Sequence, residues 1–421
     1  MANKVYAGEF HDAIDEASAA VEAQVVAWRR DVHEHPELSN REYRTAKLVA
    51  AHLNDLGLEV TTGISNTGVL GVLRGGKPGP VVALRADMDA LPVVEQTGLP
   101  YASKVTADYL GKEVGVMHAC GHDNHVAILM GVASVLTGLR DELPGTVKFI
   151  FQPAEEGAPP GEASGAEVMV QEGVLENPDV DAIFALHVFQ AGTVGTASYR
   201  SGGAMASAQS YEIEIVGRQT HGARPWEGVD PIVAGAQIIS ALQTIVSRQV
   251  DITVSPAVVT VGTFESGTRF NIVPDRAKLT GTIRSYDVET RELVHRQVRE
   301  IATSVGSALG AEVTVTIDRG VPVTYNDPAL TAAMVPTLER VYGKENVTTA
   351  PRQTGAEDFS FFQEKVPGFY FFIGVRPVDV PAEDTIPNHS PFFYADETAL
   401  VPGVRAMANV AFDYLKANAG R

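Results

Sequence analysis

Three short apolar stretches, each followed at once by polar side chains, constrain the fold of this chain more than any other feature. Each stretch has the length and apolar character of a strand buried in a sheet. In an open α/β sheet, polar groups just beyond the carboxyl ends of such strands lie where ligands bind. The stretches, with the residues that follow them, are Val81–Arg85 with Asp87 and Asp89, Gly145–Phe151 with Glu155 and Glu156, and Ala182–Leu186 with His187. The sequence therefore predicts an α/β fold with a site at one edge of its sheet.

The stretch 117–125, MHACGHDNH, has the composition of a metal site. It holds the one cysteine of the chain, Cys120, together with one carboxylate and three of the eleven histidines. Thiolate, imidazole and carboxylate are the usual ligands of divalent transition metals. For any one of these residues alone, a buried thiol or a structural histidine is the more ordinary interpretation. The clustering favours metal binding, and the apolar pattern of 126–139 places the cluster at the start of a predicted helix.

The other candidate site residues each allow a structural interpretation as well. Of two adjacent acids on a strand exit, one can face a metal while the other faces a substrate as a proton carrier, and a charged loop is the alternative for Glu155 and Glu156. For Asp87 and Asp89 the alternative is a solvated strand end with an arginine salt bridge. Two helices are predicted between 10 and 56, and for the histidines and carboxylates of 33–37 between them helix-end packing and solvation are the structural alternative.

The length of 421 residues exceeds what one hydrophobic core usually supports, so two domains are expected. Within 206–318 the pattern is βαββαβ, which predicts an inserted ferredoxin-like α+β domain with four strands and two helices. Its strands are expected at 211–216, 257–264, 277–285 and 312–317, and its helices at 232–248 and 292–309. Residues 1–205 and 319–421 are expected to form one discontinuous domain, a mixed sheet flanked by helices, with helices at 328–342 and up to about 415.

The composition of the chain limits the classes of partner that it can bind. Hydrophobic residues make up 45% of the chain and charged residues 20%, and no apolar run reaches the ~18 residues of a membrane span. The net charge of -19 opposes binding to nucleic acid or anionic membranes. The start of the chain lacks the basic and apolar regions of an export signal, and one cysteine fits a reducing compartment. We therefore expect a cytoplasmic protein with a small-molecule substrate.

Eight motifs in order carry a resemblance to a known family: RADMDALP, MHACGHDNH, FQPAEEG, ALHV, THGARP, NIVPD, GAEDFSFF and NHSPF. Together they resemble the amidohydrolase branch of the M20 metallopeptidase family, which contains aminoacylases, hippurate hydrolases and auxin-conjugate hydrolases. The resemblance runs nearly end to end. It implies that the inserted domain acts as a lid and pairs subunits, giving a homodimer or a higher homo-oligomer.

The resemblance also implies a role for individual residues. The ligands of two divalent ions would be Cys120, His122, Glu156, His187 and His389. Glu155 would be the general base and then the general acid, and Asp89 would orient its neighbours. From the inserted domain, His221 would donate to the oxyanion in the site of a partner subunit, and Asn271 and Arg284 would contact polar groups of the substrate. Asp87 stands where other branches carry a metal-binding histidine, so its role as a ligand stays open.

The implied activity is hydrolysis of the amide bond of N-acyl amino acids. The ligand types suit zinc, manganese, cobalt or nickel better than calcium or magnesium. One alternative is a dipeptidase or aminopeptidase, in which Glu357 or Asp358 would anchor the free amine of the substrate. The other is a metal-dependent binding protein without catalysis, whose mark would be the loss of the proton carrier or of a ligand. This chain retains the proton carrier, Glu155, and it retains ligand residues at Cys120, His122 and His389.

Overall fold

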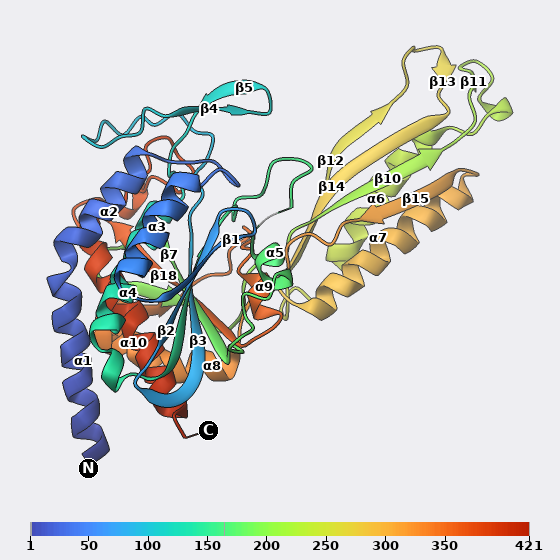
Figure 1. Ribbon diagram of the computed structural model, residues 1–421. Coiled ribbons are helices and arrows are strands. Elements are labelled where there is room, and N and C mark those ends of the chain that lie inside the picture. Colours follow the sequence, from blue (N-terminus) through green and yellow to red (C-terminus); the bar gives the residue numbers. More distant parts are fainter. Residues whose placement is uncertain (1, 164, 421) are drawn as a thin grey trace. The chain divides into compact units, whose positions relative to one another are not determined.

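The computed structural model describes residues 2–163 and 165–420, which divide into two compact units (Figure 1). Unit 1 comprises Met1–Gly202, Asn326–Pro351 and Phe361–Arg421, and unit 2 comprises Gly203–Tyr325 and Arg352–Ser360. The sequence placed the boundaries of the inserted domain at 206 and 318. The segment 352–360 belongs to unit 2 because the backbone N–H of Ala206 lies against the carbonyls of Gln353 and Gly355, at 3.0 and 3.1 Å.

Unit 1 is built on an eight-stranded mixed sheet with the order β1-β2-β6-β3-β7-β18-β8-β17. The four central strands β6, β3, β7 and β18 run parallel, and β1, β2 and β8 add antiparallel pairs. The strand bounds are β1 Glu59–Ile64, β2 Gly68–Arg74, β3 Lys77–Asp87, β6 Pro144–Gln152, β7 Ala182–Thr193, β8 Ala197–Tyr199, β17 Val347–Thr349 and β18 Gly368–Arg376. The carboxyl ends of β6, β3 and β7 therefore lie at one edge of the sheet.

The helices of unit 1 bury this sheet. Figure 1 shows α1, α2, α4 and α10 together on one side of it, and their apolar faces share one core with the strands. Helix α4 is apolar all round and buried over almost its whole length, as expected of a helix enclosed by neighbours. The helix bounds are α1 Ala2–Ala20, α2 Glu22–Glu34, α3 Tyr43–Asp55, α4 His122–Gly138, α5 Gly165–Gln171, α8 Pro328–Tyr342, α9 Ser360–Gln363 and α10 Leu400–Asn418.

Three features of unit 1 differ from expectation. The region 10–56 holds parts of three helices where two were predicted, because α1 and α2 are divided at Val21, which carries no breaker signal. Helix α4 begins at His122, four residues before the predicted apolar run. The chain between β3 and α4 forms a hairpin that the sequence did not predict, with β4 Thr106–Tyr109 and β5 Lys112–Gly115. In Figure 1 this hairpin lies above the large sheet.

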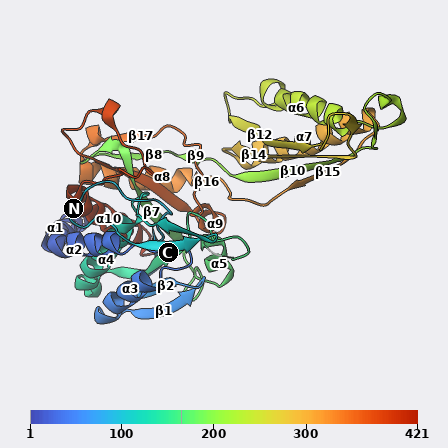
Figure 2. The same cartoon turned by 90° about the horizontal axis from the view of Figure 1, so that it is seen from above.

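Unit 2 has the predicted ferredoxin-like topology. Its four antiparallel strands have the order β12-β14-β10-β15, with both helices α6 and α7 running along the sheet (Figures 1 and 2). The bounds are β10 Gln209–Val216, α6 Pro231–Arg248, β12 Ala257–Ser266, β14 Arg276–Ser285, α7 Val288–Ala308 and β15 Glu312–Ile317. Both helices begin where an aspartate side chain, Asp230 or Asp287, accepts backbone N–H groups of the first turn.

Short strands complete unit 2. Two of them, β11 Thr220–His221 and β13 Ile272–Val273, pair with each other, and β9 Gly202–Met205 pairs with β16 Thr324–Asn326. Among all described residues, no helix combines the length and the apolar character needed to span a membrane.

Candidate metal centre

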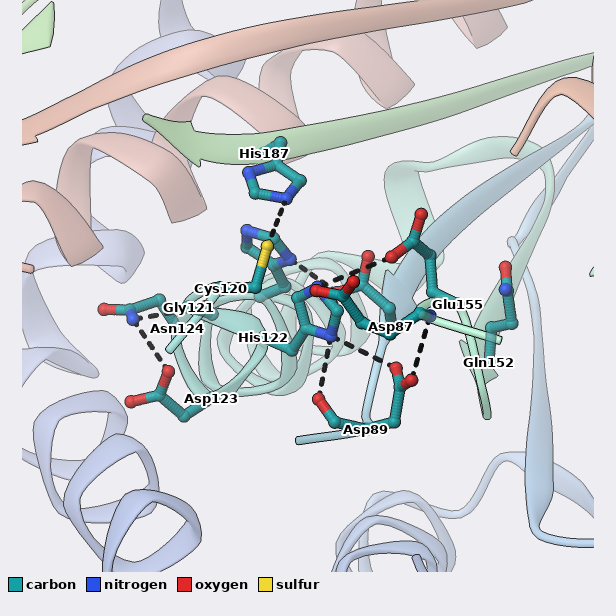
Figure 3. A network of polar contacts seen from close by, with 12 residues as sticks. Asp87, Asp89, Cys120, Gly121, His122, Asp123, Asn124, Gln152, Glu155 and His187 are labelled. Carbon is teal, nitrogen blue, oxygen red and sulfur yellow. Dashed lines mark hydrogen bonds and ion pairs between the residues drawn. The ribbon is translucent and has the colours of Figure 1, made fainter. Parts of the chain in front are cut away.

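The strand ends of unit 1 bring together ligand-type residues that lie far apart in the sequence (Figure 3). Strands β6, β3 and β7 are neighbours, and β3 pairs with β7 only as far as Arg85 and Ala185. His187 lies within β7, two residues beyond the last pair with β3 and opposite Phe372 of β18. The turn after β6 supplies Glu155 and Glu156, and the start of α4 faces them.

His122 presents one nitrogen to the centre. Its Nδ1 donates to the backbone carbonyl oxygen of Asp89 at 2.8 Å and lies 3.2 Å from the Asp89 carboxylate. Its Nε2 is buried and has no hydrogen-bond partner among the described residues. A histidine whose outer nitrogen is held by a carboxylate or carbonyl keeps the other nitrogen as a lone pair for a metal. The geometry of His122 fits a ligand.

Cys120 lies between two further imidazoles. Its Sγ is 3.4 Å from Nε2 of His187 and 3.3 Å from Nε2 of His389. The Nδ1 of His187 donates to the carbonyl of Val188 at 2.7 Å, which directs Nε2 toward the sulfur. The backbone N–H of His389 donates to the carbonyl of Ala119 at 2.7 Å, so the late loop is fixed against the cysteine segment.

The two glutamates have different surroundings. Glu156 Oε1 lies 3.0 Å from Nε2 of His389, which places this carboxylate in one group with Cys120. The backbone N–H of Glu156 donates to Oδ2 of Asp89 at 3.0 Å, so Asp89 holds both Glu156 and His122. Glu155 Oε2 lies 3.9 Å from Nε2 of His122. Both carboxylates therefore reach the centre.

Asp87 and His125 contact each other and hold the strand that carries His187. Asp87 accepts from Arg85 and from Nδ1 of His125, each at 2.5 Å, and Nε2 of His125 accepts the backbone N–H of Val188 at 2.9 Å. Both nitrogens of His125 are thus engaged. These contacts favour an orienting role for Asp87 and His125, while Asp87, His122 and His125 also lie close enough together to form a candidate metal group.

Gly121 separates the two ligand residues of the CGHD motif and is required by its surroundings. Its φ is 98°, a conformation that only glycine adopts readily. A Cβ at this position would lie 2.3 Å from Cγ2 of Val188 and 3.2 Å from the ring of Phe393. A larger residue would therefore displace Cys120 or His122.

The centre gathers carboxylates and a thiol in a largely buried environment. Burial, followed by the charges of Glu156 and Glu155, raises the pKa of the Cys120 thiol well above its usual value. Burial lowers the pKa of His122, but Asp87 and Asp89 outweigh burial and raise it to about 10. Such a cluster of carboxylates and a thiol needs a positive charge, and a divalent cation would also favour the thiolate.

The ligand atoms form two groups that share Cys120. In one group the atoms of Cys120, His122 and His187 lie within 4.8 Å of one another, and in the other those of Cys120, Glu156 and His389 do. A thiolate can bridge two ions, so the five residues fit a site for two divalent metals. The orphaned Nε2 of His122 and the mixed sulfur, nitrogen and oxygen donors support this fit.

Sequence reasoning missed the residues behind the centre. Glu42 is fully buried and accepts the backbone N–H of Ala154 at 2.9 Å and that of Asn40 at 3.0 Å, which fixes the turn that bears Glu155. Ser39 donates to Asp89 at 2.8 Å. Burial, and then the charge of Asp89, raises the pKa of Glu42 to about 7. In the stretch 35–42, HPELSNRE, the proline and Glu37 mark a break in the helical pattern, but nothing there signals the long-range contact of Glu42.

A second buried network holds the start of α4. Asp123 accepts from Nε of Arg29 at 2.9 Å and from Nδ1 of His33 at 2.8 Å. His33 lies in the last turn of α2, as the helix-end interpretation expected, and its side chain is buried against the start of α4. Burial opposes ionisation of Asp123, but Arg29 and His33 outweigh it and lower the pKa of this carboxyl well below its usual range. His118 is buried beside this network and contributes no hydrogen bond to a described residue.

The site residues expected in the inserted domain all lie in unit 2, but they are not gathered together there. His221 is exposed and lies next to Asn271, whose carbonyl accepts the N–H of Gly222 at 2.8 Å. Arg284 lies near the far end of β14, roughly 26 Å from Arg276 at the start of that strand at ~3.3 Å per residue. Glu357 and Asp358 also belong to unit 2 and are buried.

Comparison with known proteins adds to this geometry. The sequence pattern of peptidase family M20/M25/M40 matches residues 83–413. A putative amidohydrolase, YhaA of Bacillus subtilis, is 39% identical over 93% of this chain and 94% of its own length. Thermostable carboxypeptidase 1 of Saccharolobus solfataricus is 41% identical over 94% of this chain and 96% of its own length. An N-acetylcysteine deacetylase of Bacillus subtilis is 39% identical over 94% and 98%.

Solved structures agree with the fold. A putative aminohydrolase from methicillin-resistant Staphylococcus aureus superimposes with a TM-score of 0.88 at 32% identity, covering 96% of this chain and all of the other. The YXEP protein of Bacillus subtilis, described as a dinuclear metal binding peptidase, has a TM-score of 0.78 at 36% identity, covering 94% and 99%.

Proposed function

The chain belongs to peptidase family M20/M25/M40 and is a hydrolase, and from this premise we propose that it cleaves the amide bond of N-acyl amino acids with two divalent metal ions. The products would be a carboxylic acid and a free amino acid. The names of two relatives, an amidohydrolase and an N-acetylcysteine deacetylase, support this substrate class. The dinuclear metal site named for the YXEP protein supports the metal count.

One observation carries the proposal: Cys120 belongs to two groups of candidate ligands, and the Glu155 carboxylate lies 3.9 Å from His122 of one of them. The groups contain His122 and His187 on one side and Glu156 and His389 on the other. The outer nitrogens of His122 and His187 are occupied by hydrogen bonds, which leaves their inner nitrogens available. A metal-assisted hydrolase requires such a preorganised ligand set and a separate proton carrier.

The chain's own residues would then carry the proton. Bound divalent ions would supply Lewis acidity to the amide carbonyl and lower the pKa of a water molecule. Glu155 accepts one proton of the attacking water as the oxygen–carbon bond forms. It delivers that proton to the amide nitrogen as the carbon–nitrogen bond breaks, so the amino acid leaves as an amine. Asp89 keeps His122 and the Glu155–Glu156 turn in place throughout.

Residues of unit 2 would complete the reaction. In this proposal His221 donates to the oxyanion, and Asn271 and Arg284 bind polar groups of the substrate, the planar guanidinium of Arg284 being suited to a carboxylate. Unit 2 would serve as a lid and as the surface through which two copies pair. The separation of His221 from Arg284 within one unit supports a role for His221 in the site of a second copy.

The proposal is tested with a substrate panel. The purified chain is stripped of metal, reloaded separately with zinc, manganese, cobalt or nickel, and assayed with N-acetyl, N-benzoyl and longer N-acyl amino acids. We expect release of free amino acid with at least one metal and none in the stripped protein. Turnover that survives complete metal removal would contradict a metal-dependent mechanism.

A second candidate is a peptidase that acts on free peptides. The carboxypeptidase relative, at 41% identity over nearly the whole chain, favours this alternative. A free substrate amine needs an acidic anchor, for which Glu357 or Asp358 is suited by charge. Parallel assays with a free dipeptide and its N-acetyl form discriminate the two. Turnover of the free dipeptide alone would replace the N-acyl substrate class with this one.

A further inference from the structure

Beside the metal centre, unit 1 contains an open cavity of about 240 Å³ that begins at Glu156. We propose that this cavity, called here the hairpin cavity, holds the acyl group of the substrate and that the β4–β5 hairpin selects for an uncharged, bulky group such as an aromatic ring. This inference rests on the proposed function and deepens it. The apolar wall of the hairpin cavity consists of Leu38, Ala90, Leu91, Pro92, Tyr109 and Leu110.

The charged groups that line the hairpin cavity are engaged elsewhere. Arg41 is the cation among its described lining residues, and it forms a two-point ion pair with Glu162, with nitrogen–oxygen distances of 2.7 and 3.0 Å. Asp108 accepts the backbone N–H of Gly111 at 3.1 Å within the hairpin turn. Glu156 contacts His389. The hairpin cavity therefore has a mixed lining, in which the apolar side chains form one wall and the charged groups already have partners.

These charges decide which half of the substrate fits. The amino-acid half carries a carboxylate, which would meet the carboxylates of Glu156 and Asp108 while Arg41 is occupied by Glu162. The acyl half is uncharged and gains by burial against the apolar wall, at roughly 25 cal/mol per Å² of apolar area. The hairpin cavity therefore suits the acyl group.

The volume indicates the size of that group. An enclosed apolar cavity of about 150 Å³ is large enough to bind benzene. The hairpin cavity, at about 240 Å³, can take a ring together with a linking methylene group. An acetyl group would leave most of this space unfilled.

The wall contributed by the hairpin is held in place by a small core of its own. Leu38, Ala90 and Val116 form a buried apolar cluster, and Val105 and Ala107 at the base of the hairpin pack against it. Leu91 also pairs with Met117 through backbone hydrogen bonds of 3.0 Å in both directions. The base of the hairpin is thereby tied to the stretch that carries Cys120.

The test compares two substrates that differ only in the acyl group, N-phenylacetylalanine and N-acetylalanine. The variant Tyr109→Ala/Leu110→Asn removes the hairpin part of the wall from the metal-loaded enzyme. Both side chains are 37% or more exposed, and Leu110 has a φ of 54°, which asparagine tolerates well. Tyr43→Ala is the matched control, because Tyr43 is a 59% exposed tyrosine at a different surface groove of unit 1.

We expect the double variant to lose about tenfold in kcat/KM for the phenylacetyl substrate, mainly through KM, and less than about twofold for the acetyl substrate. Tyr43→Ala should change neither. An equal loss for both substrates, or no loss for either, overturns the inference. So does an Arg41→Gln variant that raises KM equally for both substrates, because Arg41 would then receive the substrate carboxylate.

A binding measurement separates this inference from the proposed function. Calorimetric titration with phenylacetate and acetate reports on the hairpin cavity without turnover. If the wild type cleaves no N-acyl amino acid but binds phenylacetate more tightly than acetate, and the double variant loses that difference, the cavity assignment stands and the proposed reaction fails. If the two acids bind wild type and variant alike, the cavity assignment fails whatever the enzyme cleaves.

Discussion

The metal centre depends on which atom of each side chain is left to face inward. One nitrogen of His122 and one of His187 form a hydrogen bond to a backbone carbonyl, whereas both nitrogens of His125 form hydrogen bonds, to Asp87 and Val188. Three histidines close together in the centre therefore leave different atoms available. The residue type alone does not distinguish them, whereas the hydrogen bonds do.

Glu155→Gln is predicted to remove turnover without removing metal. The amide keeps the shape of the carboxylate but cannot carry a proton, so kcat should fall by about a hundred- to ten-thousand-fold. Metal content, measured by elemental analysis of the purified protein, should match the wild type because Glu155 is not among the proposed ligands. The matched control is Glu113→Gln on the exposed side of β5, which should keep full activity. Comparable activity in Glu155→Gln would reject the assignment.

Cys120→Ser is predicted to weaken metal binding. A hydroxyl stays protonated at neutral pH and is a poor ligand, so both groups that share this position lose a donor. We expect the affinity for zinc, measured by competition with a chelating dye, to fall by more than about tenfold. The thermal unfolding temperature of the metal-free variant provides the control for folding. Unchanged affinity and stoichiometry would show that the sulfur is not a ligand.

At the scale of the elements, the sequence predicted those with a strong apolar pattern. The strands at 81–85, 145–151 and 182–186 lie inside β3, β6 and β7. The apolar run 126–139 placed the ligand cluster at the start of a helix, but the first residue of α4 could not be read from that run, because buried polar groups such as His122 and Asp123 precede it. The β4–β5 hairpin was missed because its strands are largely exposed and carry no alternating pattern.

The turns behind the centre were harder to foresee for a physical reason. The turn after β6 is held by Glu42, more than a hundred positions earlier in the chain, and no local pattern reports such a contact. Ala154 has a φ of 52°, and this backbone conformation is kept only because its N–H is fixed from outside. Long-range hydrogen bonds of this kind become visible only in the folded chain.

Glu42→Ala is predicted to lower both stability and kcat. It leaves the buried N–H groups of Asn40 and Ala154 without their acceptor, at a cost of about 1–3 kcal/mol each, and frees the turn that bears Glu155. Urea unfolding and steady-state kinetics measure the two effects. Glu42→Gln retains one acceptor oxygen and should recover most of kcat.

Glu37→Ala is the matched control for this prediction. Glu37 also accepts two backbone N–H groups, those of Arg44 and Thr45, but it does not contact the turn after β6. It should lower the free energy of unfolding and leave kcat near that of the wild type. If Glu37→Ala and Glu42→Ala reduced kcat equally, Glu42 would have no specific role in positioning Glu155.

At the scale of the whole molecule, the sequence predicted an α/β sheet domain interrupted by a ferredoxin-like insertion, and the fold and the family are confirmed. Three apolar strand stretches indicated the sheet domain, length and the βαββαβ pattern indicated the insertion, and the eight motifs indicated the family. The segment 352–360 could not be assigned to unit 2, because its link to Ala206 is formed by backbone groups that carry no sequence signal. The roles of unit 2 as lid and pairing surface remain proposals.

Pairing of copies gives the last prediction, which concerns His221. If His221 of one copy serves the metal centre of another, two inactive variants should complement each other. In a mixed dimer of Glu155→Gln with His221→Ala, one site combines an intact Glu155 with an intact His221. Random mixing makes half of the dimers mixed, each with one of two sites complete, so activity should return to about a quarter of the wild-type value.

The experiment unfolds the two variants together, refolds them with metal and measures turnover against each variant refolded alone. Arg284→Ala mixed with Glu155→Gln serves as a comparison, because Arg284 lies at the opposite end of β14 from His221 and is not expected to cross to a second copy. That mixture should stay inactive. If the His221→Ala mixture does not recover activity, His221 acts in the site of its own chain and needs no second copy. If His221→Ala alone is active, His221 takes no part in the reaction.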